Sequence, residues 1–312
     1  MSDQADEFAR AYKRETGRAP GRDVPLREHS NFRIGGPADL FVATAASAEL
    51  RMAVTMARAA GLRHRVIGGG FNLLFDDEGY RGLIIKNSAR GIAFSAALET
   101  IEAASSAPID ELTETAASLG WGGLEFLAGI PGTIGGAVYG NAGAFGRAIC
   151  DVLIEARIMH PDDRETRVGP ETLEFGYRHS RLKRSSDILL GATLRLTSAP
   201  SDRIRAAMEE NLALRTRRHP PRHTAYPGSY FKNPILADGT KQAAGFLLEQ
   251  AGVRGLRIGG ASVFPGHCNF IINDAGAAAR DVLALAAEMK RRVLEKFGIG
   301  LEEEVVYLPA SA

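Results

Sequence analysis

The 312-residue sequence has only two cysteines, Cys150 and Cys268, and a formal net charge of +1. Two cysteines in unrelated contexts argue against a disulfide framework and against a cysteine-rich metal site. Of the seven histidines, only His219 and His223 are four residues apart, and the two prolines between them disfavour a helix that would bring them together. We therefore predict no structural metal. A net charge near zero creates no basic field, so nothing points to nucleic acid as a partner.

Long hydrophobic runs are also absent. No apolar stretch approaches the roughly 20 residues that a transmembrane helix needs. The N-terminus, Met1-Ser-Asp-Gln-Ala-Asp-Glu7, is acidic and lacks the apolar centre of a secretory signal. With 45% hydrophobic and 24% charged residues, the chain has the composition of an ordinary globular protein long enough for two domains. We expect a cytoplasmic protein without a membrane partner, with a monomer as the default.

Glycine, in contrast, is concentrated in two stretches, and the longer one covers residues 120–146. This stretch is too rich in glycine for an ordinary helix and too apolar for a solvated linker. Glycine costs conformational entropy on ordering, so it persists where the backbone takes positive φ or where a ligand approaches the main chain. Small side chains also leave N–H groups free to point at an anion. This density favours a large bound cofactor over a plain structural corner.

The second stretch places three glycines, residues 68–70, directly after a strand-like run. A Rossmann phosphate loop would need a helix immediately after the glycines and an acidic residue roughly 20 positions further on. Here the glycines lead instead into a turn at residues 76–79 and another strand-like run at 83–86. The order strand, glycine turn, strand disfavours a Rossmann fold.

Periodicity predicts the regular elements. Helices are predicted over residues 47–60, 108–119, 203–218, 241–251 and 279–297, with another around 6–14. Strands are predicted over residues 64–67, 83–86, 152–160, 165–168, 188–196, 261–264, 269–273 and 304–307. A turn cluster at residues 198–202 marks a domain boundary. We therefore expect an N-terminal extension at 1–28, a larger domain at 29–197 and a smaller α+β domain at 198–312.

Further motifs accompany the glycine stretches along the chain. They are Asn31-Phe-Arg-Ile-Gly-Gly-Pro-Ala38, Tyr177-Arg178, Gly228-Ser-Tyr-Phe-Lys-Asn-Pro234, Ala244-Gly-Phe-Leu-Leu-Glu249, His267-Cys-Asn-Phe-Ile-Ile-Asn273 and Leu301-Glu-Glu-Glu-Val305. In these motifs and their order, the chain resembles the UDP-N-acetylenolpyruvoylglucosamine reductases, flavoenzymes of peptidoglycan precursor synthesis. The resemblance runs from about His29 to Val305. It implies an α+β fold, with a two-part FAD-binding domain of the vanillyl-alcohol-oxidase type at 29–197 and a smaller α+β substrate-binding domain at 198–312.

The resemblance also implies a reaction. The reductase would take hydride from NADPH through FAD and reduce the enolpyruvyl group of UDP-N-acetylglucosamine enolpyruvate, giving UDP-N-acetylmuramate. Such a reduction needs a hydride donor, an acid for the neighbouring carbon and charges that stabilise an enolate-like intermediate. No side chain donates hydride, so a flavin reduced by a nicotinamide dinucleotide is required. The alternatives are another FAD oxidoreductase of the same fold and a catalytically silent paralogue that binds a nucleotide sugar or a partner.

Three residues match the catalytic positions of the family. Arg178 would grip the substrate carboxylate, a role that suits a bidentate guanidinium. Ser229 would be the acid, activated by either Lys232 or a bound water, and Glu304 would act at the developing enolate. Beside a substrate carboxylate, we expect Glu304 to be protonated and to donate a hydrogen bond. Without the motifs, the serine would be a turn-capping hydroxyl, the arginine a surface residue and the glutamate one member of the acidic triplet 302–304.

The same motifs imply the binding residues. Those for FAD are Arg33, Ile34, Gly35, Gly36, Ile67, Gly68, Gly69, Gly70, Phe71, Asn72, Leu73, Gly129, Ile130, Pro131, Gly132, Thr133, Gly135, Gly136, Asn141, Ala142 and Gly143. Those for the nucleotide-sugar substrate are Tyr177, Lys232, Asn233, His267 and Asn269. The basic run 215–223 is either a solvated helix end or a lining for a diphosphate substrate.

Several positions depart from the family pattern. Phe71 replaces the usual serine after the three glycines, and Ala104-Ser-Ser-Ala107 replaces the usual Ala-Gly-Ala after the strand near residue 103. Val306 stands in place of an arginine, and Gly266 in place of a lysine. None of these is one of the three catalytic residues. The peptide N–H donors for phosphate remain, so we expect FAD to bind.

Overall fold

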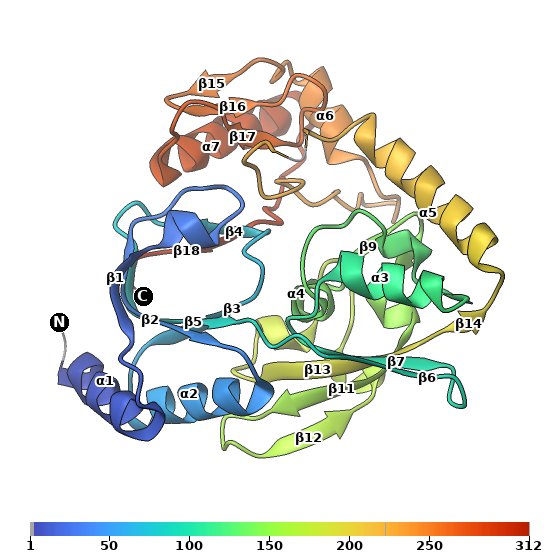
Figure 1. Ribbon diagram of the computed structural model, residues 1–312. Helices are drawn as coiled ribbons and strands as arrows, with labels where there is room; N and C mark the ends of the chain where they lie inside the picture. The colour runs from blue at the N-terminus through green and yellow to red at the C-terminus, as the bar shows by residue number, and fades with distance from the viewer. Residues whose placement is uncertain (1–2, 222, 312) are drawn as a thin grey trace. The chain divides into compact units, whose positions relative to one another are not determined.

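The structure is a computed structural model and describes residues 3–221 and 223–311. The chain divides into two compact units that alternate along the sequence. Unit 1 comprises Met1–Arg22, Leu40–Gly69 and Gly82–Arg215, and unit 2 comprises Asp23–Asp39, Gly70–Arg81 and Thr216–Ala312. Both contain helices and sheets, as expected for an α+β protein (Figure 1).

The first part of unit 1 is built around helices α1 (Asp3–Thr16) and α2 (Ser47–Ala59). Strands β1 (Gly21–Pro25), β2 (Pro37–Thr44), β5 (Tyr80–Asn87) and β3 (His64–Ile67) form a sheet in that order, with β3 and β5 parallel. Phe8, Val54 and Ile85, from α1, α2 and β5, are buried in one hydrophobic core. The predicted helix at 47–60 is confirmed, because its apolar stripe faces this core and Gly61 follows it with a φ of 59°.

The second part of unit 1 is an antiparallel sheet of five strands. Its order is β12 (Glu165–Val168), β11 (Leu153–Met159), β13 (Ile188–Arg195), β7 (Thr100–Ala104) and β6 (Ile92–Ser95). The alternating patterns at 152–160, 165–168 and 188–196 predicted its first three strands correctly. Helices α3 (Ile109–Ser118) and α4 (Ile134–Gly140) share a core with this sheet (Figure 1). Two short strand pairs complete the unit, β8 (Trp121–Gly122) with β14 (Thr197–Ser198) and β9 (Gly143–Ala144) with β10 (Arg147–Ala148).

Helix α4 lies inside the glycine-rich stretch 120–146, whose composition predicts no ordinary helix. Its first turn is capped by Thr133, whose Oγ1 accepts a hydrogen bond from Gly136 N at 3.3 Å. Ile134 and Val138 are fully buried in the core of the five-stranded sheet. Asn141 ends the helix in the left-handed conformation, with a φ of 45°. Capping and burial therefore offset the low helix propensity of its glycines.

Helix α5 (Ser201–Thr216) follows the turn cluster at which we expected the domain boundary. Ile204 and Met208 on this helix are buried against Ala117 and Ala128 of unit 1. The division between the compact units consequently falls after Arg215. Turn residues mark where a helix starts, whereas the apolar face of that helix decides which core it joins.

Unit 2 combines a three-stranded antiparallel sheet with two helices. The sheet has the order β15 (Arg257–Ile258), β16 (Ala261–Val263) and β17 (Ile271–Asn273), and the helices are α6 (Ala244–Gln250) and α7 (Ala279–Phe297). Strands β4 (Leu73–Phe75) and β18 (Val306–Leu308) pair in parallel. Leu247, Val263, Val282 and Met289 are buried in one core. The bounds predicted for α7 are confirmed.

Helix α6 is shorter than its predicted range of 241–251. Asn233 Oδ1 accepts a hydrogen bond from Ala244 N at 2.9 Å, and Ile235 forms a bridge with Lys241. The residues before Ala244 are thus used in a turn, so the helix begins only where Asn233 supplies an acceptor for its first N–H.

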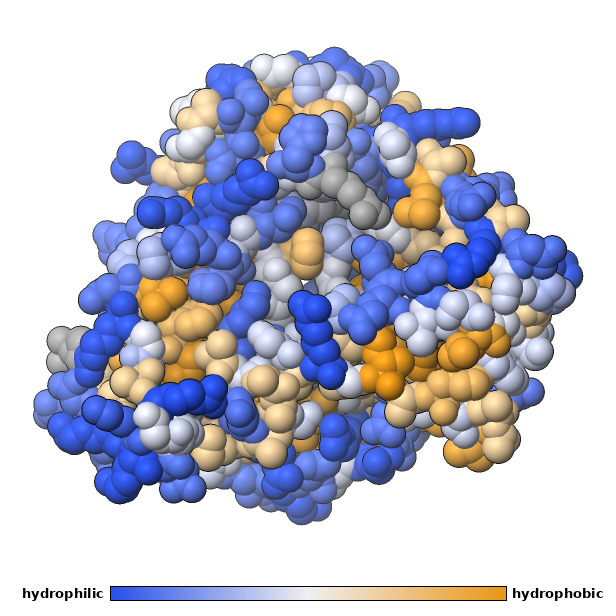
Figure 2. Space-filling model, in the orientation of Figure 1, coloured by the Kyte–Doolittle hydropathy of each residue, from blue (hydrophilic) through white to orange (hydrophobic). Residues whose placement is uncertain are grey.

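The helices within residues 3–221 and 223–311 lack long apolar stretches. In the part of the chain that the structure describes, no helix has both the length and the apolar character needed to cross a bilayer. On the face drawn in Figure 2, hydrophilic residues predominate and apolar residues lie between them.

Candidate active site

In unit 1, the predicted cofactor residues lie on loops that touch one another through their main chains. A Cβ on Gly135 would lie 2.7 Å from the backbone oxygen of Ser105, and one on Gly68 would lie 2.8 Å from the side-chain Oγ1 of Thr133. Gly135 N donates to Ser105 O at 2.6 Å, and Ile134 N donates to Ala107 O at 3.0 Å. The end of β3, the loop after β7 and the start of α4 therefore converge; position 135 requires glycine, and a side chain at 68 would displace that of Thr133.

The serines that replace the expected small residues after β7 point into the protein. Asn87 Nδ2 donates to Ser105 Oγ at 2.8 Å, and Ser106 Oγ donates to Asn87 O at 2.6 Å. Asn87, Ser105 and Ser106 are all buried. Hydrogen bonds to the end of β5 accommodate this departure from the family pattern. Sequence analysis did not identify Asn87, because a single asparagine at a strand end carries no recognisable pattern.

The remaining predicted cofactor residues of unit 1 are mostly half-buried. Gly69, Gly129, Ile130, Gly132, Ala142 and Gly143 are half-buried, Pro131 and Gly136 are exposed, and Ile67 and Asn141 are buried. The main chain is thus presented with few bulky side chains beside it. Peptide N–H groups of this kind bind phosphates, so these residues fit the pyrophosphate of a dinucleotide such as FAD.

Arg178 lies in a tight turn between Gly176 and His179, whose N–H and C=O groups are hydrogen-bonded to each other in both directions at 3.1 Å. The φ of Arg178 is 54°, a left-handed conformation that is uncommon for a residue with a side chain. Its Nη2 donates to Gly143 O at 3.1 Å, and its guanidinium carbon lies 5.3 Å from the centre of the Tyr177 ring. The two predicted residues of this motif are therefore adjacent to the predicted cofactor residue Gly143.

Side chains attach this turn to the end of α4. Asn141 Nδ2 donates to Gly176 O at 2.9 Å, and Asn141 Oδ1 accepts from Cys150 N at 3.3 Å. Ser180 Oγ donates to Tyr139 O at 2.7 Å. The amide of Asn141 is thus used to join backbone segments. Sequence analysis did not identify Ser180, although it stands only two residues after Arg178.

In unit 2, the predicted cofactor glycines pack against other backbone segments. A Cβ on Gly36 would lie 2.2 Å from Asp77 O, and one on Gly70 would lie 2.1 Å from His29 O. Gly35 is also closely packed, and Ile34 is buried. Arg33 is exposed, has a φ of 54° and donates from Nη2 to His223 O at 3.3 Å. The space beside these glycines is filled by protein, so their contribution to a cofactor site would come from their peptide groups.

Asn72 links the glycine turn of unit 2 to the segment that carries Glu304. Its Nδ2 donates to Glu304 O at 3.0 Å, and its carbonyl accepts from Val306 N at 3.1 Å. Leu73 then begins β4 and pairs with Val306 of β18. Phe71, the departure from the family serine, is half-buried. Val306, where the family has an arginine, is a pairing position in this two-stranded sheet.

Ser229 and Glu304 lie on two segments that run antiparallel. Glu304 N donates to Tyr230 O at 2.8 Å, and Lys232 N donates to Glu302 O at 2.9 Å. This register brings the residue after Ser229 opposite Glu304. The sequence positions of the two proposed catalytic residues are 75 apart (304 − 229 = 75), and the backbone pairing makes their segments neighbours.

Asn269 fixes the Ser229 segment from its other side. Its Oδ1 accepts from Phe231 N, its Nδ2 donates to Phe231 O, both at 2.9 Å, and its own carbonyl accepts from Tyr230 N at 2.8 Å. Asn269 is buried. Asn269, which we expected to bind substrate, therefore holds the segment that carries the proposed acid Ser229.

Charged groups surround the same segment. Lys232 Nζ lies 2.9 Å from Glu302 Oε2, and this lysine holds the pKa of Glu302 below its usual value. Burial, reinforced by the charge of Glu303, raises the pKa of Tyr230, so the tyrosine stays neutral over the physiological range. In this structure, the ammonium that we considered as an activator of Ser229 is paired with a carboxylate.

The ring of His267 is packed against protein and hydrogen-bonded to the main chain. Burial, together with the positive charge of Arg218, lowers the pKa of His267, which favours the neutral imidazole at pH 7. Its Nδ1 accepts from Asn269 N at 3.1 Å, and a Cβ on Gly245 would lie 2.5 Å from its ring. The ring is therefore packed against α6. Gly266, the departure from the family lysine, is exposed.

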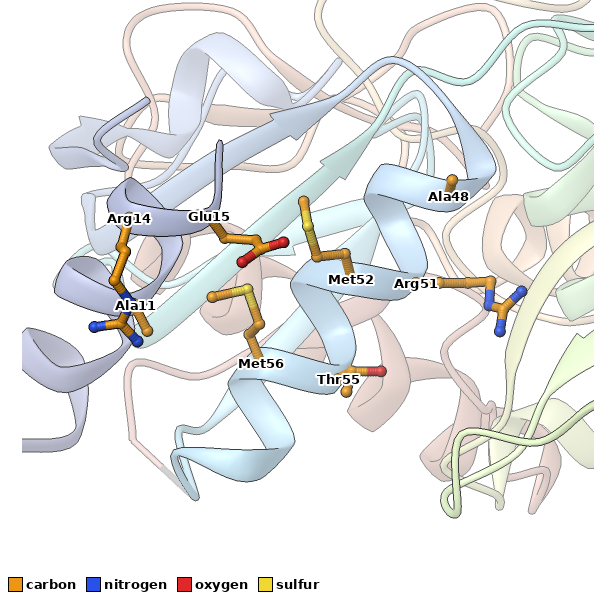
Figure 3. Close-up of a pocket in the computed structure, with 8 residues that line it drawn as sticks. All are labelled: Ala11, Arg14, Glu15, Ala48, Arg51, Met52, Thr55 and Met56. Atoms are coloured by element: carbon orange, nitrogen blue, oxygen red, sulfur yellow. The ribbon is translucent and has the colours of Figure 1, made fainter. Parts of the chain in front are cut away.

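One pocket lies apart from the predicted site residues. A pocket of about 400 Å³ between α1 and α2 is lined by residues of those two helices, among them Arg14, Glu15, Met52 and Met56 (Figure 3). Among the residues with described positions, no three His, Cys, Asp or Glu side chains gather as a metal site would require. The absence of a structural metal stays a prediction.

Comparison with known proteins identifies the family. Residues 38–169 match a family model described as an FAD binding domain, and residues 220–308 match one described as the C-terminal domain of UDP-N-acetylenolpyruvoylglucosamine reductase. The reductase of that name from Geobacter sulfurreducens is 41% identical over 288 residues, covering 91% of this chain and 92% of the relative. The one from Synechococcus sp. (strain JA-3-3Ab) is 39% identical over 286 residues, covering 90% and 89%.

A solved structure agrees with these relatives. The crystal structure of UDP-N-acetylenolpyruvylglucosamine reductase from Thermus caldophilus has a TM-score of 0.77 and 34% sequence identity, and the match covers 92% of this chain and 98% of that one. The predicted fold class, an FAD-binding domain followed by a smaller C-terminal domain, is confirmed, and the protein is an FAD-binding flavoprotein. More specifically, the chain belongs to the UDP-N-acetylenolpyruvoylglucosamine reductase family.

Proposed function

We infer that this protein is the FAD-dependent reductase that converts UDP-N-acetylglucosamine enolpyruvate to UDP-N-acetylmuramate with NADPH, in the synthesis of peptidoglycan precursors. Family membership over about 90% of the chain supports this reaction. The observation in the structure that carries it is the antiparallel pairing in unit 2, which makes the segments of Ser229 and Glu304 neighbours. An acid and a glutamate on adjacent segments suit protonation beside a developing enolate.

The residues of this chain would divide the reaction among them. Bound FAD supplies the hydride, which it receives from NADPH. Arg178 binds the substrate carboxylate and stabilises the negative charge that develops there. Ser229 transfers its hydroxyl proton to the carbon next to the one that receives hydride, and Glu304 donates a hydrogen bond to the enolate. Lys232 and a bound water remain the two candidates for making the serine more acidic.

The binding roles belong to the same proposal. The peptide groups of residues 68–70 and 129–136, with 33–36 and 141–143, hold the cofactor. Tyr177, Lys232, Asn233 and His267 hold the nucleotide sugar, and Asn269 contributes by fixing the segment of Ser229. The FAD-binding domain would comprise 29–197 and the substrate-binding domain 198–312. We further propose a cytoplasmic monomer that has no nucleic-acid or membrane partner.

A visible spectrum recorded without oxygen tests the function. The purified protein should show flavin bands that bleach with NADPH and return when UDP-N-acetylglucosamine enolpyruvate is added. Bleaching without return would leave the cofactor and reject the substrate. A protein that stays colourless after reconstitution with FAD would support the silent-paralogue alternative. UDP-N-acetylglucosamine, which lacks the enolpyruvyl group, is the matched control and should not restore the bands.

A further inference from the structure

The backbone of Arg178 is held in a conformation that a residue with a side chain rarely adopts. Its φ is 54°, and no glycine relieves the position. Left-handed residues of this kind persist only where the surrounding structure holds them, and they cluster at functional sites. Something must therefore fix this turn, since an arginine that grips a carboxylate works only from a defined position.

Lys183 contacts the turn at the strained residue itself. Its Nζ donates to Arg178 O at 2.8 Å, so it binds the carbonyl whose direction the left-handed conformation sets. The same ammonium lies 5.6 Å from the centre of the Tyr139 ring on α4. Lys183 is half-buried. A cation over an aromatic ring and against a carbonyl is in a specific position, unlike a lysine extended into solvent.

Tyr139 is itself fixed in place. Arg65 Nη2 donates to its hydroxyl at 3.0 Å, and Ser180 Oγ donates to its carbonyl at 2.7 Å. Lys183 therefore connects Arg178 to a ring that is anchored on β3 and on the same turn. These contacts all lie within unit 1.

We propose that Lys183 is a positioning residue for Arg178 and that it acts by holding the left-handed turn against Tyr139. This inference rests on the proposed role of Arg178 in binding the substrate carboxylate. Lys183 has no contact with substrate in this assignment, so its effect reaches the reaction through Arg178 alone.

Substitutions at Lys183 separate the possible contributions. Lys183→Met keeps the length of the side chain and removes both the donor and the charge. Lys183→Gln retains a donor without charge, and Lys183→Arg retains both. Arg184→Met is the matched control, because Arg184 is an exposed neighbour whose ion pair with Glu174 lies at the surface. The flavin-loaded protein is used throughout.

Two quantities are measured for each variant. The first is kcat/KM for UDP-N-acetylglucosamine enolpyruvate, and the second is its Kd for the oxidised enzyme, read from the change in the flavin spectrum. We expect Lys183→Met to lower kcat/KM by about 10- to 100-fold, the size expected when a reacting group is misplaced by about 1 Å. Lys183→Arg should keep most of the wild-type kcat/KM, and Arg184→Met should have the wild-type value.

A double-mutant cycle with Arg178→Ala decides how Lys183 acts. If Lys183 works through Arg178, adding Lys183→Met to Arg178→Ala should change neither quantity further. A loss that adds fully in the double variant would overturn the inference, as would wild-type values for Lys183→Met. If Arg178→Ala itself changes neither quantity, the proposed function of Arg178 fails and this inference fails with it. Should Lys183→Met not fold, the Lys183→Gln variant runs the same cycle.

Discussion

The two units hold their proposed catalytic residues by different means. In unit 1, the turn of Arg178 is attached by side chains, from Asn141, Ser180 and Lys183. In unit 2, the segments of Ser229 and Glu304 are joined to each other by backbone hydrogen bonds, and one side chain, that of Asn269, holds the Ser229 segment from its other side. A side-chain contact disappears with one substitution, whereas a backbone hydrogen bond survives most of them. Substitutions around Arg178 should therefore move its guanidinium, whereas a substitution at Ser229 should remove the proton donor and leave the segment in place.

The length of each side chain explains the difference. Arginine is long and loses considerable rotamer entropy when it is fixed, so contacts along the turn are needed to direct it. A serine hydroxyl lies close to its own backbone, and a fixed segment is enough to place it. The following substitutions test this comparison.

The largest expected effect follows from removing the proposed acid. Ser229→Ala should lower the rate at which UDP-N-acetylglucosamine enolpyruvate reoxidises the reduced flavin by about 10²- to 10⁴-fold, the range for loss of a general acid. Bleaching of the flavin by NADPH should persist, because the segment keeps its backbone hydrogen bonds. Stopped-flow absorbance measures both half-reactions. Unchanged reoxidation would remove Ser229 from the mechanism.

The next effect tests how the segment in unit 2 is held. Asn269→Ala removes two hydrogen bonds to Phe231 and leaves a buried N–H and C=O without those partners. We expect a loss of about 3 kcal/mol in the free energy of unfolding, since each unsatisfied buried group costs roughly 1–3 kcal/mol. Urea denaturation followed by circular dichroism measures it. Gln250→Ala, at an exposed helix end, is the control, and equal stability for the two variants would contradict this account.

Asn141 gives the matching test in unit 1. Asn141→Ala loses the hydrogen bonds to Gly176 O and Cys150 N and places alanine at a φ of 45°. We expect a loss of about 2 kcal/mol in the free energy of unfolding, because the left-handed conformation adds roughly 1 kcal/mol to the missing bonds.

Asn141→Gly separates the two causes, because glycine accepts the conformation without the hydrogen bonds. It should be more stable than Asn141→Ala and should still weaken binding of UDP-N-acetylglucosamine enolpyruvate through the Arg178 turn. The free energy of unfolding and the substrate Kd are measured for both variants. Wild-type binding by the glycine variant would show that the turn does not depend on this side chain.

The smallest effect depends on pH and concerns the far end of the loop that carries Arg178. Burial would raise the pKa of Asp187, but hydrogen bonds from His160 and Ser185 and the charge of Arg181 outweigh it and hold the pKa below its usual value. His160 Nδ1 lies 2.9 Å from Asp187 Oδ1, and Arg181 Nη2 lies 2.8 Å from Oδ2. A lowered pKa contributes stability above the unfolded value of about 3.9, and this is lost as pH falls through the folded value.

Asp187→Asn should therefore be less stable than the wild type at pH 7 by about 1 kcal/mol. The difference should shrink as the pH falls below about 4, because the carboxylate of the unfolded state takes up a proton there and the folded one follows only at lower pH. Thermal unfolding of the two proteins between pH 3 and pH 7 provides the measurement. A difference that stays constant over this range would show that the carboxylate charge is not the cause.

Local patterns predicted much of the fold. The helix at 279–297 has a complete apolar stripe and a glycine after its last residue, so its bounds were readable before any tertiary contact was known. The bounds of helix α4 were not readable in this way, because its glycines are poor helix formers and the helix depends on the Thr133 cap and on the burial of Ile134 and Val138. The contacts of Ile204 and Met208 on α5 could not be read from the sequence either, because their partners Ala117 and Ala128 are far away in the chain.

The motifs predicted which residues belong to the candidate site, but several of those residues have other contacts in the structure than the motifs imply. Asn141, Asn269 and Asn72 were expected to bind ligands, and in the structure their amides hold backbone segments. A motif identifies the residue type at a position. It does not say which neighbour the side chain meets, because that neighbour comes from another part of the chain.

The sequence by itself determined the family, the cofactor class and most helices and strands, because these depend on motifs and on local periodicity. Only the tertiary structure decided that Ser105 and Ser106 bond to Asn87, that Ser229 and Glu304 lie on paired segments and that Lys183 binds the carbonyl of Arg178. These contacts depend on the direction of the side chains and on the register of the paired backbone segments. Both are set when distant segments pack together, so no local stretch of sequence contains them.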